Sequence, residues 1–209
     1  MTLPAISNHL EMHARFRPDV EVLVDVDTGR RFTWASLWDL AQRWVGRLAA
    51  QGVGPGDRVA VLAHNRAETF AVLYACAELG ATLFPMNWRL AAAERQWQLD
   101  HARPRVCLTG PAFRGDLPGS LPLDEDPGAA PARGPGSDLD DPWMLLYTSG
   151  TSGRPKGALI THRQAHWNAV NTVLACALDA SASTLTCTPL FHTGGLNCLS
   201  TPLLHAGGR

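Results

Sequence analysis

The chain has 209 residues, of which 45 % are hydrophobic and 18 % charged, and its formal net charge is −1. This apolar content is enough for the core of one large domain or two small ones, which excludes a disordered chain. A charge so close to zero provides no basic field, so nucleic acid is excluded as a partner.

Two further patterns concern the cell compartment. Five cysteines stand singly along the chain, which argues against a disulfide framework and against a zinc site. They are Cys76, Cys107, Cys176, Cys187 and Cys198. We find no secretory signal and no stretch of the roughly 18 apolar residues that a membrane span needs. A cytoplasmic protein without a transmembrane segment is therefore expected.

The first part of the chain, residues 1–110, predicts an α/β region. Apolar and polar residues alternate on both sides of residues 27–29, which is typical of a β-hairpin. Thr33 is placed to cap a helix over 34–50, in which apolar residues recur at helical spacing, and Gly52 stands where a C-terminal glycine cap belongs.

Strands and helices alternate after this helix. The pattern predicts a strand over 58–63, a helix capped by Asn65 with one apolar face and ending at Gly80, a strand over 81–87, a helix over 91–102 and a strand over 105–109. Such an order with short connections predicts a parallel sheet with right-handed crossovers, covered by helices.

Residues 111–142 differ in composition from what precedes them. They are rich in Pro, Gly, Ala and Asp and show little periodicity, so a surface connection or linker is expected. We interpret their acidic side chains as solvated loop charge, and we expect no metal ligand within the chain.

The stretch YTSGTSGRPKG, residues 147–157, combines three glycines, four serine and threonine hydroxyls and two cations. Glycine lets backbone N–H groups converge on an anion, while hydroxyls and a lysine add donors and charge, which suits phosphate. A Walker loop is excluded because Lys156 is preceded by proline and followed by glycine. The alternative is a plain turn, but apolar runs at 143–147 and 158–162 predict buried strands on both sides.

The rest of the chain completes a third region, residues 143–209. Thr161 is placed to cap a helix over 162–178, a strand is expected over 184–189, and residues 190–209 begin as a loop and become a helix.

The stretches YTSGTSGRPKG, ALITH and PLFHTGGL, in this order, resemble the AMP-forming acyl-CoA synthetases of the adenylate-forming enzyme superfamily. The stretch from Gly56 to Leu90 is similar to the N-terminal region of that family, and PMNWRL within it is closer to fatty-acyl-CoA ligases than to the adenylation domains of peptide synthetases. The resemblance implies the N-terminal portion of the adenylate-forming fold, a mostly parallel α/β sheet covered by helices and incomplete in this chain.

The resemblance also implies site residues. The loop would wrap the β- and γ-phosphates of ATP, through Thr148, Ser149, Gly150, Thr151, Ser152, Gly153 and Lys156. His192 would lie beside the acyl pocket, where Gly194 and Gly195 would let the backbone approach the substrate. Without the resemblance, a lone histidine such as His192 is more often structural. His162, His166 and His205 match no catalytic position and are expected to be structural.

The reaction implied has two steps. A carboxylic acid attacks the α-phosphate of ATP to give acyl-AMP and pyrophosphate, and the thiol of coenzyme A then displaces AMP, with Mg²⁺ bridging phosphates. The family's catalytic lysine and its adenine-, ribose- and magnesium-binding segments find no match here, so we expect an N-terminal fragment that is inactive alone.

Two alternatives remain open. One is a stand-alone, non-catalytic remnant that binds phosphate or a partner chain, and the other is a related enzyme with a different acceptor. The uncovered sheet edge of such a fragment also favours a homo-oligomer.

Overall fold

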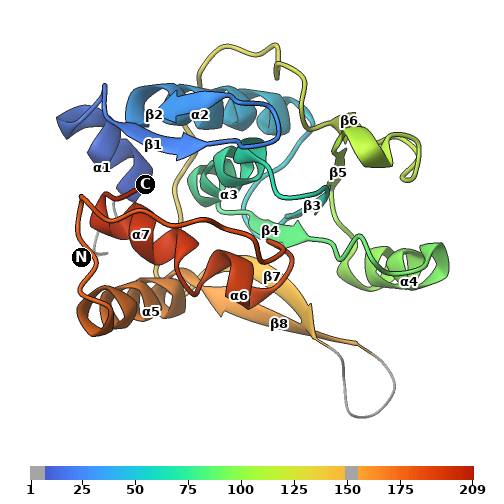
Figure 1. Ribbon diagram of the computed structural model, residues 1–209. Coiled ribbons are helices and arrows are strands. Elements are labelled where there is room, and N and C mark those ends of the chain that lie inside the picture. The colour runs from blue at the N-terminus through green and yellow to red at the C-terminus, as the bar shows by residue number, and fades with distance from the viewer. Residues whose placement is uncertain (1–7, 149–154) are drawn as a thin grey trace.

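The computed structural model of the protein describes residues 8–148 and 155–209. Within these residues, six strands form a sheet in the order β6-β5-β3-β4-β7-β8 (Figure 1). The strands are β3 (Arg58–Leu62), β4 (Thr82–Pro85), β5 (Val106–Thr109), β6 (Leu121–Pro122), β7 (Pro142–Thr148) and β8 (Lys156–Thr161). Neighbouring strands are parallel except for β7 and β8, which are antiparallel. The predicted α/β class with a mostly parallel sheet is confirmed.

The predicted hairpin and the helix after it are both present. β1 (Glu21–Val24) pairs antiparallel with β2 (Arg31–Thr33), and α2 (Trp34–Ala50) follows at once. The Thr33 hydroxyl accepts from the Ser36 N–H at 3.2 Å, and the Ser36 hydroxyl oxygen accepts from the Thr33 N–H at 2.9 Å. This capping box satisfies two backbone donors that the helix itself leaves open.

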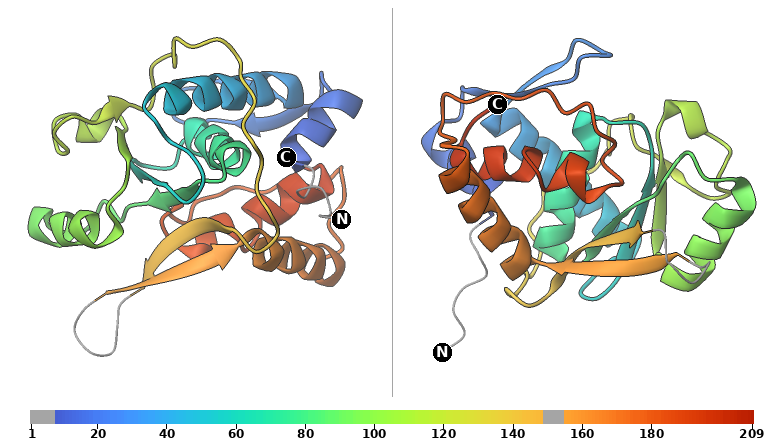
Figure 2. Two further views of the ribbon diagram at one scale, coloured as in Figure 1. Left: turned by 180° about the vertical axis from the view of Figure 1, so that it is seen from behind. Right: turned by 60° about the horizontal axis from the view of Figure 1, so that its bottom comes forward.

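Helix α3 (Ala67–Leu79) differs from its prediction in two ways. It lies between α2 and the sheet (Figure 2), and every residue from 67 to 76 is buried, so it has no polar face. Its N-cap is Arg66, which makes no side-chain cap bond, so the prediction that Asn65 caps the helix is wrong. The predicted end at Gly80 is confirmed, since φ there is 66°, in the left-handed region that glycine adopts without a steric penalty.

The two faces of the sheet are covered differently. Alternation along β3 sends Val59 and Val61 into a core shared with α2 and α3, and Ala60 and Leu62 into a smaller core with Phe113. That smaller core includes Ala102 of α4 (Ala92–Ala102), which lies at the side of the sheet in Figure 1.

Residues 111–142 have more structure than an irregular surface connection. They contain the short 3₁₀ helix η1 (Pro111–Phe113) and β6, and they bury Leu117 and Leu123. Farther on they pass over α2 (Figure 2, left), and the Gly136 N–H donates to the Glu78 carbonyl at 2.8 Å. The composition concealed this packing because the contacts join residues far apart in the chain.

The last part of the chain corrects two predictions. β7 is buried from Trp143 to Leu146, whereas β8 is exposed, with Leu159 at 54 %. β8 is therefore not a second buried strand, because it forms the sheet edge among the described residues. The strand predicted over 184–189 is absent, and the segment runs without a ladder partner.

Four helices complete the fold: α1 (His9–Phe16), α5 (His162–Ala175), α6 (Thr193–Leu196) and α7 (Ser200–Ala206). α5 begins as predicted, because the Thr161 hydroxyl accepts from the Gln164 N–H at 3.2 Å. Over the part of the chain that the structure describes, no helix is both long and apolar enough to cross a bilayer.

Candidate functional site

The candidate phosphate loop is held by the two strands at its ends. Thr148 is the last residue of β7 and Lys156 the first of β8, and the two are direct partners in the antiparallel ladder. The Thr148 hydroxyl donates to the Lys156 carbonyl at 3.5 Å. Ser149, Gly150, Thr151, Ser152 and Gly153 lie outside the described residues.

This hairpin opens at one particular edge of the sheet. β7 runs parallel to β4, and β4 to β3, so Thr148 stands at the edge where the carboxyl ends of these strands meet. In open α/β sheets, ligands bind in the crevice outside the carboxyl ends of the strands. The local donors are a hydroxyl and an ammonium group, and this donor set suits the oxygens of a phosphate better than a metal ion.

Tyr147 fixes the hairpin to helix α4. Its hydroxyl lies 2.6 Å from Nδ1 of His101, and the His101 ring stacks on Trp97 with centroids 5.1 Å apart. Burial raises the pKa of Tyr147, which keeps the phenol neutral and able to donate. The base of the loop is thus anchored by a bond between residues 46 positions apart.

The predicted acyl-pocket residues lie around the start of α6. His192 is exposed, and its carbonyl accepts from the Gly195 N–H at 3.0 Å. A Cβ at Gly195 would come within 2.3 Å of the Pro189 carbonyl oxygen, so only glycine fits there. A Cβ at Gly194 would meet Thr188 at an ordinary 3.5 Å, so packing does not require glycine at that position.

Asn65 positions the segment that precedes His192. Its side-chain NH₂ donates to the carbonyls of Thr186 and Thr188 at 3.1 and 2.9 Å, and its Oδ1 accepts from the Leu190 N–H at 2.9 Å. Because Asn65 follows β3, the segment leading to His192 is bound at the same carboxyl edge as the hairpin. Sequence analysis missed this role, since the partners are more than 120 positions away.

Aromatic side chains gather beside this segment. Trp88 follows β4, and its ring lies 6.0 Å from that of Phe191 and 6.4 Å from that of Phe113. The Arg89 guanidinium lies 4.8 Å from the centroid of the Trp88 ring. We call Trp88, Arg89, Phe113 and Phe191 the aromatic patch. Phe113 and Phe191 are buried, so the surface that the patch presents near His192 comes from the half-buried Trp88 ring and the exposed Arg89 cation.

Comparison with known proteins places this geometry in context. The model of the family described as AMP-binding enzyme matches residues 10–209. An indoleacetate–CoA ligase from Aromatoleum aromaticum is 36 % identical over 97 % of this chain and 44 % of its own length. A long-chain-fatty-acid–CoA ligase from Mycobacterium tuberculosis is 33 % identical over 90 % of this chain and 41 % of its own length.

A solved structure shares this architecture. The O-succinylbenzoate coenzyme A synthetase of Bacillus subtilis, in complex with ATP and magnesium ion, superposes with a TM-score of 0.81 and 27 % identity, over 94 % of this chain and 55 % of that one. The present chain thus spans less than half of the two curated relatives, at 44 % and 41 % of their lengths.

Proposed function

Because this chain belongs to the family of AMP-binding enzymes, we propose that it forms the phosphate-binding part of an ATP-dependent carboxylate–CoA ligase. The observation that carries the proposal is the pairing of Thr148 with Lys156 at the carboxyl edge of the parallel sheet. A hydroxyl and a cation thereby stand at the two ends of a segment whose sequence adds further hydroxyls and glycines.

The proposed roles follow from the charge that develops in the first step. Attack of the acid on the α-phosphate of ATP forms acyl-AMP and leaves negative charge on the departing pyrophosphate. Donors fixed where that charge grows lower the barrier. Lys156 and the loop hydroxyls, Thr148, Ser149, Thr151 and Ser152, would supply these donors, and bound Mg²⁺ would neutralise further phosphate charge.

Two acid classes are candidates for the substrate. The stretch from Pro85 to Leu90 resembles fatty-acyl-CoA ligases, and one relative is named for long-chain fatty acids. The aromatic patch and the relative named for indoleacetate support an aromatic acid. We propose the fatty acid first, and the aromatic acid as second candidate on the strength of the patch.

Acid-dependent exchange of labelled pyrophosphate into ATP tests the first step. The whole protein is incubated with ATP, Mg²⁺ and one acid at a time, drawn from indoleacetate, ferulate and fatty acids of medium and long chain. We expect exchange with one class and none without an acid. Absence of exchange with every acid would overturn the ligase proposal.

The acceptor needs a separate measurement. With the best acid, coenzyme A is added and the loss of free thiol is followed. Exchange without thioester formation would point to another acceptor, and binding of nucleotide without exchange would favour a non-catalytic phosphate-binding protein. The 209-residue chain assayed by itself tests the expectation that it is inactive alone.

A further inference from the structure

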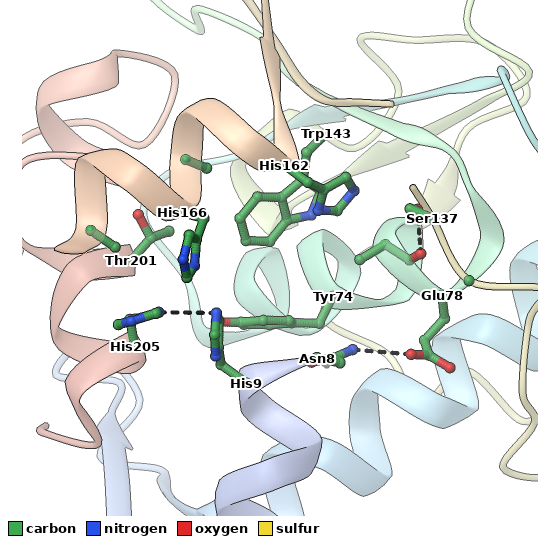
Figure 3. Close-up of a pocket in the computed structure, with 14 residues that line it drawn as sticks. Asn8, His9, Tyr74, Glu78, Ser137, Trp143, His162, His166, Thr201 and His205 are labelled. Carbon is green, nitrogen blue, oxygen red and sulfur yellow. Dashed lines mark hydrogen bonds between the residues drawn. The ribbon is translucent and has the colours of Figure 1, made fainter. Parts of the chain in front are cut away.

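Three histidines from three separate helices meet in one cavity. His9 begins α1, His166 lies on α5 and His205 on α7, and Figure 3 shows their rings turned toward one another. One ring nitrogen from each lies within 4.8 Å of the other two. The Nε2 of His9 and the Nδ1 of His205 are only 2.9 Å apart.

The cavity that these three histidines help to line has room for an ion. Its volume is about 60 Å³, and its walls include Tyr74, Trp143 and Thr201. Since a water molecule fills about 30 Å³ in the liquid, an ion with one or two waters fits. All three histidines are half-buried, so the nitrogens are shielded but not sealed from solvent.

One ring nitrogen of the cluster has no protein partner in the described part of the chain. The Nδ1 of His166 is buried without a hydrogen-bond partner among the described residues. A metal ion in the cavity would give this nitrogen a partner.

From this geometry we propose that His9, His166 and His205 form a binding site for a divalent transition-metal ion such as Zn²⁺. Zinc binds imidazole nitrogens at about 2.0–2.1 Å, so ligand atoms around a tetrahedral ion lie about 3.3 Å apart. The pair at 2.9 Å and the third nitrogen within 4.8 Å reach that spacing by small side-chain rotations. Three imidazoles without a thiolate suit Zn²⁺, Co²⁺, Ni²⁺ or Cu²⁺.

The neighbouring contacts would support such a site. His13 Nε2 lies 3.3 Å from the carbonyl oxygen of His205, and Arg17 donates to the Gly207 carbonyl at 3.1 Å, so α1 is already bound to the end of α7. These contacts to backbone carbonyls hold together the segments that carry His9 and His205. An ion here would join α1, α5 and α7, which lie far apart in the sequence.

The cavity is separate from the candidate phosphate site. His162, another lining residue, stacks on Trp143 at the amino end of β7 with centroids 4.9 Å apart. Thr148 stands at the other end of the same strand, roughly 16 Å away at about 3.3 Å per residue. The proposed ion would therefore act on the stability of the chain and not on the phosphates.

Metal titration of the purified protein tests the proposal. The protein is stripped with EDTA, and Zn²⁺ binding is measured by competition with a chromogenic chelator. We expect one ion per chain. Each of His9→Gln, His166→Gln and His205→Gln should weaken binding by about 10²-fold or more, because loss of even an outer partner of a ligand costs about 10–100-fold.

The matched control is His64→Gln, which removes an exposed histidine outside the cluster and should leave the affinity unchanged. The visible absorption spectrum of Co²⁺ bound to the unsubstituted protein reports the coordination number of the ion without any substitution. An intense four-coordinate spectrum supports the site. A weak six-coordinate spectrum, no bound ion, or an affinity insensitive to all three substitutions overturns it.

Discussion

The two ends of β7 present different chemistry. At the carboxyl end, Thr148 and the exposed Lys156 flank a polar loop that is one continuous stretch of sequence. At the amino end, Trp143 lines a half-closed cavity in which histidines from three helices meet. The first site is built by neighbours in the chain and the second by the fold, and only the first can be found without a structure.

Replacing Lys156 by Gln tests the carboxyl end most strongly. Acid-dependent pyrophosphate exchange by the whole protein should fall by about 10²–10³-fold, as when one donor to a developing anion is removed. Lys156→Arg, which keeps the charge, should lose less. Because the side chain is exposed, the free energy of unfolding should stay within about 0.5 kcal/mol of the original.

Chemical labelling provides a second test of Lys156. Lys156 is the only lysine among these 209 residues, so in this chain an amine-reactive reagent modifies one side chain. ATP should protect that amine from acylation, as followed by mass spectrometry of the peptide. Undiminished exchange in Lys156→Gln, or labelling that ATP does not slow, would remove Lys156 from the phosphate site.

At the amino end of β7, His162 is expected to make the stability of the fold depend on pH. Burial lowers its pKa to about 4, although the nearby Asp141 carboxylate opposes the shift. Below its usual value of 6.5 the unfolded chain takes up a proton that the folded chain refuses, so stability is lost as pH falls from 6.5 toward 4. The loss amounts to about 3 kcal/mol at most.

His162→Phe isolates this contribution, because phenylalanine can still stack on Trp143 but does not titrate. Urea unfolding of both proteins, with a chelator present, gives the free energy of unfolding at each pH. As pH falls through this range, the free energy of unfolding of the variant should rise relative to that of the original protein. A difference that is independent of pH would contradict the buried, neutral His162.

The same contrast explains which predictions from sequence succeeded. The β1–β2 hairpin and α2 were predictable, because alternation, helical spacing and the Thr33 cap act over a few residues. The phosphate-loop candidate was visible for the same reason, though five of its seven residues fall outside the described part of the chain.

The failures concern partners far away in the chain. Asn65 looked like a helix cap, but its bonds go to residues 186–190. The segment 184–189 has the composition of a strand, yet it gains no ladder partner there. His166 and His205 carried no recognisable spacing, because the third member of their cluster is at position 9.

The two glycines before the end of α6 form a matched pair. Gly195→Ala should lower the free energy of unfolding by about 1–3 kcal/mol, since its methyl group would press on the Pro189 carbonyl. Gly194→Ala has ordinary space and should change it by about 0.5 kcal/mol or less. Denaturant titration measures both, and equal effects would show that close approach at Gly195 does not decide this turn.

A modest effect is expected from the bond that anchors the loop. Tyr147→Phe removes the hydroxyl that lies 2.6 Å from His101 Nδ1 and keeps the ring packed against Phe84. The free energy of unfolding should fall by about 1 kcal/mol, because the His101 imidazole can then form a hydrogen bond with water instead. A double-mutant cycle with His101→Ala, read by urea unfolding, should give a coupling energy of that size.

The same cycle read by the Michaelis constant for ATP shows whether the anchor matters to the site. If Tyr147 holds the base of the loop in place, Tyr147→Phe should raise that constant a few-fold, and His101→Ala should raise it equally and not additively. Coupling in stability without any change in this constant would mean that the bond serves only the packing of α4 on β7.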